Sequence, residues 1–196
     1  MDRELQALLA DIRQWGRDHD AGESEKSRKM LNLQPETAQL LSILVRSSRS
    51  TRVLEIGTSN GYSTLWLAWS VAGAGGSVTS VDNSPEKHAL ADGNLRRAGL
   101  REVVDLQQGD ATEVARRLTG PFDFVFFDSV QVRPYLQLEV LLPKLSENAM
   151  VLADNALSHP EEMAPFMSLL ERQPGFDHVV VPIGKGLCVA YRGSAA

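Results

Sequence analysis

The sequence predicts an α/β fold: a mostly parallel sheet of seven strands with helices on both faces, preceded by two further helices. Two observations support this class. Short runs of apolar and β-branched residues alternate with longer stretches of helical periodicity, which is typical of successive strand–helix–strand units. The chain also has 196 residues and 43% hydrophobic content, enough to bury the core of such a fold. We therefore expect a single domain over residues 1–196.

The first 48 residues precede the sheet. Amphipathic helices are expected over residues 2–15 and 35–48, with a polar segment between them. Five apolar runs of strand length follow, and we interpret them as parallel strands over residues 51–57, 77–82, 103–109, 122–129 and 148–155. The sheet and its helices are expected to occupy residues 51–192.

The segments between these runs carry helix signals. In the second of them, Ser84 is a favourable N-cap, Pro85 suits the first helical position and Gly99 suits the end. The last two strands are expected to form a hairpin, because Gly184 and Gly186 turn one apolar run directly into the next. The last strand therefore runs antiparallel to its neighbours.

Charge and composition exclude several classes of partner. The net charge of −5 does not favour DNA, RNA or an anionic membrane, and no apolar run reaches the ~20 residues of a membrane span. The N-terminal residues lack the apolar core of a signal peptide. The single cysteine, Cys188, fits a reducing compartment, so we expect a cytoplasmic location.

Acidic residues stand near the carboxyl ends of all five predicted parallel strands. They are Glu55, Asp82, Asp110, Asp128 and Asp154, the last followed by Asn155. Ligands of open α/β sheets bind at this edge, near the point where the strand order reverses. Any single acid could instead cap the next helix, but five in succession favour a ligand with many donors, a cation, or both.

The turn after the first strand indicates which ligand binds there. A dinucleotide fingerprint would need glycines at Ser59 and Tyr62, so a pyrophosphate lacks its close backbone approach. Residues 55–61 instead read E-x-G-x-x-x-G, and Asp82 follows 25 residues after Gly57, where a carboxylate can bridge a ribose diol. A ligand with a ribose, no phosphate and an ammonium group is S-adenosylmethionine.

The chain resembles class I S-adenosylmethionine-dependent methyltransferases. More narrowly, it is similar to the cation-dependent O-methyltransferases related to catechol and caffeoyl-CoA O-methyltransferase. The segments VLEIGTSNGYSTLWLA, FDFVFFDS, VLADNALSH and GLCVAYR match that family's blocks in order, and LNLQPETAQLL resembles its lid helix. The resemblance covers roughly residues 30–192 and implies a Rossmann-like fold in which residues 1–48 supply the helical lid.

The resemblance and the chemistry of the residues together suggest how the cofactor is held. Gly57 lets the backbone approach the methionine portion, and Ser63 can donate to the cofactor carboxylate near a helix N-terminus, although it could also serve only as a helix cap. The family places Ala111 against the adenine and Leu33 over the cofactor, although Leu33 could simply pack its helix. The expected cofactor-binding residues are Leu33, Glu55, Gly57, Ser63, Asp82, Asp110, Ala111 and Asp128.

Asp128, Asp154 and Asn155 form a candidate metal site. The two aspartates are 26 residues apart, a spacing that a helical crossover between adjacent strands can span. Carboxylate and amide oxygens suit Mg²⁺. The resemblance implies that the metal binds both oxygens of a catechol and lowers the pKa of the attacking hydroxyl. Alternatively, Asp128 holds only the cofactor's ammonium group and the Asp-Asn pair caps a helix.

One position departs from the family. Three residues after the aspartate of the fourth strand the family carries a lysine that serves as general base, whereas this chain has Gln131, which cannot accept a proton at neutral pH. His159 lies at the same edge and is an alternative base, unless it is merely solvated. The expected catalytic residues are Asp128, Gln131 and His159.

Three functions are compatible with the sequence. We favour a metal-assisted O-methyltransferase acting on a small, catechol-like acceptor. The alternatives are a metal-independent methyltransferase of the same fold with another acceptor, and a cofactor-binding protein without catalysis. A homodimer is expected as well, because family members commonly dimerise and Leu5, Leu8, Leu9 and Ile12 form an apolar stripe on the first helix.

Overall fold

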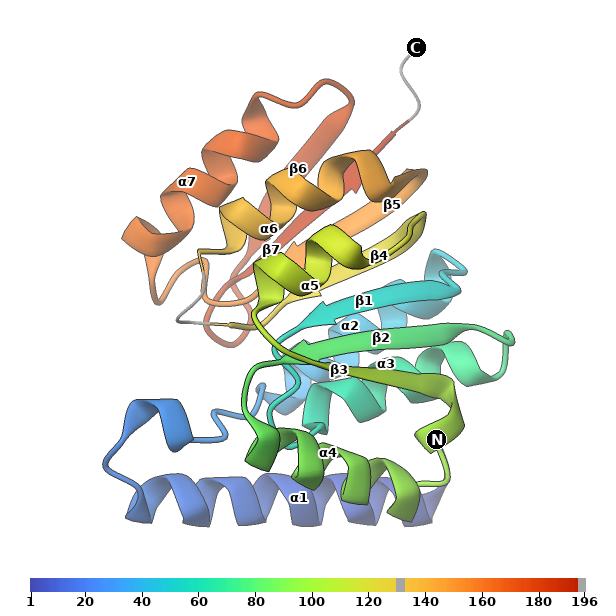
Figure 1. The fold of residues 1–196 in the computed structure, drawn as a ribbon, viewed down its shortest axis with the longest axis vertical. Helices are drawn as coiled ribbons and strands as arrows, with labels where there is room; N and C mark the ends of the chain where they lie inside the picture. The colour runs from blue at the N-terminus through green and yellow to red at the C-terminus, as the bar shows by residue number, and fades with distance from the viewer. Residues whose placement is uncertain (130–132, 194–196) are drawn as a thin grey trace.

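The computed structural model describes residues 1–129 and 133–193, and it is built on a seven-stranded sheet (Figure 1). The strand order is β3-β2-β1-β4-β5-β7-β6. The strands are β1 (Arg52–Ile56), β2 (Ser77–Asp82), β3 (Val104–Gln108), β4 (Phe122–Phe127), β5 (Leu145–Ala153), β6 (Phe176–Val181) and β7 (Leu187–Arg192). Strands β1 to β5 pair in parallel, and β7 is antiparallel to both β5 and β6. The predicted fold class is therefore confirmed.

Helices cover both faces of the sheet. They are α1 (Arg3–Gly22), α2 (Pro35–Ser47), α3 (Tyr62–Ala72), α4 (Pro85–Arg97), α5 (Ala111–Arg117), α6 (Pro134–Leu141) and α7 (Pro160–Glu171), with short 3₁₀ turns η1 (Lys26–Arg28), η2 (Arg101–Val103) and η3 (Leu142–Lys144). Helices α1 to α4 contribute to one core cluster and α5 to α7 to the other. The central strand β4 is apolar at all of its residues except Asp123, because both of its faces are covered.

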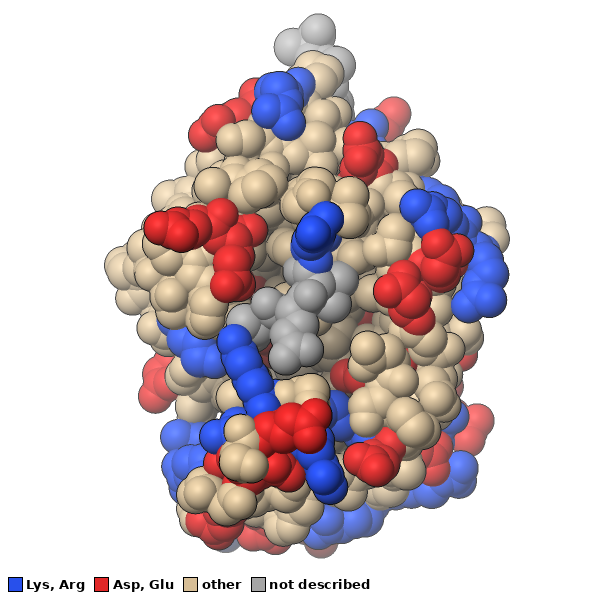
Figure 2. All heavy atoms as spheres, turned by 60° about the vertical axis from the view of Figure 1, so that its left-hand side comes forward, with Lys and Arg blue, Asp and Glu red and all other residues tan. Residues whose placement is uncertain are grey.

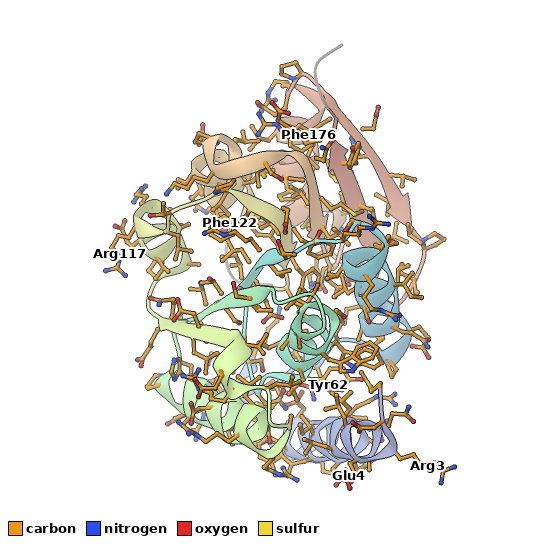
Figure 3. All side chains as sticks on the ribbon, turned by 90° about the vertical axis from the view of Figure 1, so that its right-hand side faces the viewer. Arg3, Glu4, Tyr62, Arg117, Phe122 and Phe176 are labelled. Carbon is orange, nitrogen blue, oxygen red and sulfur yellow. The ribbon has the colours of Figure 1, made fainter. Side chains whose placement is uncertain are left out.

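Most charged side chains lie on the surface and most large apolar side chains lie in the core, as the layering requires. Figure 3 shows Arg3, Glu4 and Arg117 pointing away from the molecule, and these three are exposed. Phe122 and Tyr62 are buried at 3% and 4% exposure, one in each core cluster. The amphipathic pattern of the sequence thus predicts which face of each element is covered.

The predicted helix signals of α4 are confirmed. Ser84 Oγ accepts a hydrogen bond from the N–H of Lys87 (3.3 Å), Pro85 is the first helical residue, and Gly99 adopts a φ of 66° beyond the end. The first helix is longer than predicted, because it continues through the polar residues to Gly22. No proline interrupts that segment, so polarity alone does not end the helix.

The apolar stripe of α1 is used within the chain itself. Leu5, Leu9 and Ile12 are buried, and α1 packs against α3. These side chains therefore supply no surface for the predicted homodimer, which stays a prediction. Within the two described ranges, no helix is both long and apolar enough to cross a membrane.

Candidate active site

The carboxyl ends of the five parallel strands form one continuous rim. Beyond the ends of β1, β4 and β5, the backbone N–H groups of Gly57, Asp128 and Asp154 each donate to a carbonyl of the adjacent strand, at 2.8, 2.9 and 2.9 Å. The N–H of Gly109, which follows β3, donates to the carbonyl of Asp82 in β2 at 3.0 Å. The rim carries the acidic residues that the sequence predicted to lie at a common edge, as expected for parallel strands in register.

The glycine turn after β1 is held against the end of β4. Gly57 has a φ of 110°, and a Cβ built on it would lie 2.2 Å from the backbone oxygen of Asp128. Gly61 has a φ of 85°, and its Cβ would lie 3.2 Å from Ala91 of α4. Glycine is needed at residue 57 for conformation and for space, so the turn brings the start of α3 close to the rim.

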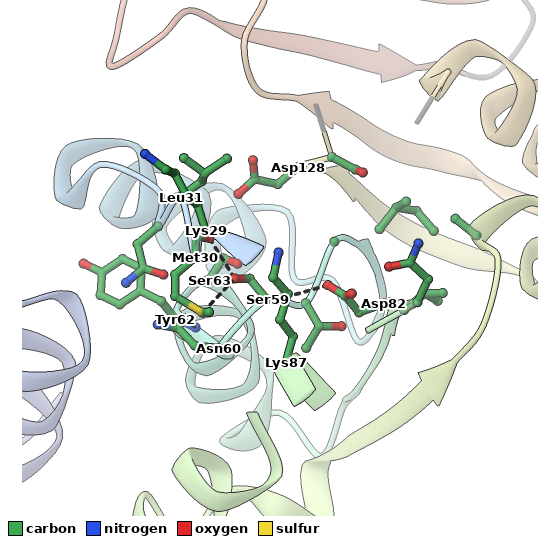
Figure 4. A pocket seen from close by; sticks show the side chains of 18 of the residues that line it. Lys29, Met30, Leu31, Ser59, Asn60, Tyr62, Ser63, Asp82, Lys87 and Asp128 are labelled. Carbon is green, nitrogen blue, oxygen red and sulfur yellow. Dashed lines mark hydrogen bonds between the residues drawn. The ribbon is translucent and has the colours of Figure 1, made fainter. Parts of the chain in front are cut away.

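A cavity of about 190 Å³ opens above this turn. Seven of the eight predicted cofactor-binding residues line it: Leu33, Gly57, Ser63, Asp82, Asp110, Ala111 and Asp128. In Figure 4, Asp128 lies on one side of the cavity, and Ser59, Ser63 and Asp82 lie on the other. The sequence therefore predicted residues that the tertiary structure brings together around one space.

Asp82 is oriented by backbone donors. Its Oδ2 accepts from the N–H of Ser59 (2.8 Å) and its Oδ1 from the N–H of Ser84 (3.0 Å). Each carboxylate oxygen keeps further acceptor capacity. Ser59 also donates through Oγ to the carbonyl of Met30 (2.7 Å) and so ties the turn to the segment before α2. The sequence analysis missed this role of Ser59.

Glu55 lies below the cavity and does not line it. It is fully buried, and its Oε2 accepts from the hydroxyls of Thr64 (2.5 Å) and Ser80 (2.6 Å). Burial raises the pKa of Glu55 to about 7, with a smaller contribution from the charge of Asp82. Glu55 thus connects β1 to α3 and β2, and its predicted contact with the cofactor stays a prediction.

Asp128 and Asp154 follow adjacent strands, with Phe127 and Ala153 as register partners just before them. Burial, the charge of Asp154 and then that of Glu55 raise the pKa of Asp128, while burial raises the pKa of Asp154. The Oδ1 of Asp154 is buried without a hydrogen-bond partner in the described part of the chain. Two poorly neutralised carboxylates with a free oxygen are a donor set that suits a hard cation.

The remaining predicted residues lie on the far side of Asp154. Asn155 has a φ of 70°, and its Oδ1 accepts from Ser158 Oγ at 3.3 Å. A smaller cavity is lined by Asp154, Asn155 and His159, and Ser129 lines both cavities. Gln131 lies outside the described residues. Among those described, no group of three or more His, Cys, Asp and Glu residues could hold a metal; the predicted set has two carboxylates and one amide.

Two lysines around the larger cavity, Lys87 and Lys185, were not identified from the sequence as site residues. Lys26, Lys29, Lys87 and Lys185 all line it. The signal for Lys185 was its place between two glycines of a hairpin that returns to the rim. On the face shown in Figure 2, acidic and basic side chains are interspersed. The lysines that line the cavity are thus a local cluster of positive charge in a chain whose net charge is −5.

Known proteins are similar to this chain in sequence. A family model described as a methyltransferase domain matches residues 54–156. The chain is similar to the catechol O-methyltransferase of Niastella koreensis, at 30% identity over 139 residues, which cover 68% of this chain and 62% of that protein. It is also similar to the catechol O-methyltransferase of Mycobacterium tuberculosis, at 32% identity over 62% of this chain and 56% of the other. The chain thus spans less than two thirds of the length of these relatives.

A solved structure gives the same fold. The O-methyltransferase from Bacillus cereus in complex with SAH superposes with a TM-score of 0.82, covering 95% of this chain and 90% of that chain at 22% identity. The likeness extends to the helices before the first strand, because nearly the whole chain is covered. The chain belongs to the methyltransferase domain family, and both relatives described above are named catechol O-methyltransferases.

Proposed function

We propose that the chain is an S-adenosylmethionine-dependent O-methyltransferase that acts on a small catechol-like acceptor with the help of a divalent cation, Mg²⁺. The observation that carries the proposal is the pair Asp128 and Asp154. These carboxylates follow adjacent strand ends, Asp128 lining the larger cavity and Asp154 the smaller one, and one buried oxygen of Asp154 has no hydrogen-bond partner in the described residues. Two carboxyl groups kept this close and this buried stay ionised together only if a cation neutralises them.

The cofactor would occupy the larger cavity. Asp82, whose carboxylate is held by the N–H groups of Ser59 and Ser84, would accept from both ribose hydroxyls. Ser63 stands in the first turn of α3, where a carboxylate is favoured. Asp110 also caps α5, because its Oδ1 accepts from the N–H groups of Thr112 and Glu113; its Oδ2 is left for the adenine side. The SAH held by the Bacillus cereus protein is the demethylated form of this cofactor.

Asp128, Asp154 and Asn155 would hold the metal, and a bound Mg²⁺ would lower the pKa of an acceptor hydroxyl. The rim would position the acceptor oxygen in line with the methyl group. In the transfer that oxygen would form a bond to the methyl carbon while the carbon–sulfur bond breaks, and the sulfonium would become a neutral thioether. The hydroxyl proton leaves to a base, for which His159 at the start of α7 is the proposed acceptor.

The test is methyl transfer from S-adenosylmethionine to catechol, measured with EDTA and after Mg²⁺ is restored. We expect EDTA to abolish turnover, Mg²⁺ to restore it, and Asp154→Ala to remove the Mg²⁺ response. Glu171→Ala, an exposed carboxylate at the end of α7, is the matched control. Turnover that survives both EDTA and Asp154→Ala would favour the metal-independent alternative. Cofactor binding without turnover on any acceptor would favour a binding protein.

A further inference from the structure

Lys185 stands at the tip of the β6–β7 hairpin, where the sequence indicated only a turn. It lines the larger cavity together with Asp128 and Ser129, which follow β4. The hairpin thus brings a basic side chain from the C-terminal part of the chain to the edge where the acceptor is expected. The proposed function assigns no cofactor-binding, metal-binding or catalytic role to any residue of this hairpin.

The hairpin tip is held on two sides. The Lys185 carbonyl accepts from the N–H groups of Leu157 and Ser158 at 3.0 Å each, so the tip is bound to the loop that follows Asp154. On the other side, a Cβ on Gly184 would lie 2.5 Å from Thr37 Oγ1 in the first turn of α2. Because both sides are closely packed, the backbone of Lys185 has a defined position relative to the rim.

The charge of Lys185 has no close partner. It makes no ion pair within the described residues. It nevertheless lies at the rim, because it lines the same cavity as Asp128. An ammonium group near the acceptor end, but not paired with either carboxylate, is available to a ligand.

The surroundings of Lys185 indicate what that ligand carries. In the proposed function Asp128 and Asp154 hold the cation, so neither is left to pair with Lys185. Within the described residues Lys185 therefore keeps a positive charge without an ion-pair partner. Since an unpaired charge in a partly enclosed site is unfavourable, the acceptor should bring an anionic group.

We propose that Lys185 binds a carboxylate on the acceptor, so that the substrates of this site are hydroxylated aromatic acids. This inference rests on the proposed function for the position of the acceptor. Lys185 is then a specificity-determining residue that distinguishes an aromatic acid from its neutral ester. The contact is a charge-assisted hydrogen bond, which is among the stronger polar contacts in proteins.

The experiment compares 3,4-dihydroxybenzoate with its methyl ester, which has the same catechol and no charge. Lys185→Met should raise KM for the acid about ten- to a hundredfold, the range for loss of a charge-assisted hydrogen bond, and leave KM for the ester within about twofold. Lys185→Arg should retain most of the preference for the acid. The matched control is Arg172→Met, which removes a positive charge from the exposed far end of α7.

A second readout needs no turnover. Calorimetry on the chain with S-adenosylhomocysteine should show that the acid binds more tightly than the ester, and that Lys185→Met removes this difference without changing affinity for S-adenosylhomocysteine. If the acid shows this Lys185-dependent binding but neither compound is methylated, the proposed function fails and the inference stands. Equal losses for acid and ester, or a wild-type chain that does not prefer the acid, would overturn the inference alone.

Discussion

Glu55 should make the stability of this chain fall as the pH rises. Burial raises its pKa from 4.5 to about 7, so the folded state holds the proton more tightly than the unfolded state. Each unit of pKa difference corresponds to about 1.36 kcal/mol, and the shift therefore amounts to about 3 kcal/mol. This contribution to the free energy of unfolding is fully present below about pH 4.5 and is lost as the pH rises through about 7.

The perturbation is Glu55→Gln, which keeps the size of the side chain and cannot ionise. The hydroxyls of Thr64 and Ser80 can still donate to the amide oxygen, so we expect little change where Glu55 is protonated in both states. Between pH 5 and pH 8.5 the variant should gain about 2.5 kcal/mol of stability relative to the wild type. The neutral amide also removes repulsion from Asp128, which acts in the same direction.

The assay is urea unfolding followed by circular dichroism at pH 5 and pH 8.5, with Glu171→Gln as an exposed control. The difference between wild type and variant isolates Glu55, since the other titrating groups are common to both proteins. Parallel pH dependences for the wild type and Glu55→Gln would refute the reasoning. They would mean that Glu55 ionises in the folded state as readily as in the unfolded chain.

Two further predictions concern the cofactor turn. Gly57→Ala should lower the free energy of unfolding by about 2–6 kcal/mol in urea, because its φ is 110° and its Cβ would lie 2.2 Å from the Asp128 carbonyl oxygen. Gly93→Ala, in the interior of α4 with open space around its Cβ, should instead gain about 0.5–1 kcal/mol. Asp82→Ala should weaken binding of S-adenosylhomocysteine in calorimetry about ten- to a hundredfold, and an unchanged affinity would contradict the ribose assignment.

The sequence by itself predicted the order of strands and helices and the edge at which the acids lie. These features follow from local patterns: apolar runs make strands, Ser84 and Pro85 start a helix, and Gly57 ends a strand in a turn. Parallel strands place their carboxyl ends together whatever their side chains. The shared edge of the cofactor and metal candidates was therefore predictable before any contact was known.

The tertiary structure decided which side chains face the cavity and which do not. Glu55 and Asp82 both lie near strand ends. Glu55 is buried and bonded to Thr64 of α3, whereas Asp82 lines the cavity and accepts a hydrogen bond from the N–H of Ser59. Lys185 reaches the rim only because β7 inserts between β5 and β6 and carries the hairpin tip back to Asp128. Such contacts join residues far apart in sequence, and no local periodicity encodes them. Their positions depend on how distant loops pack once the sheet has formed.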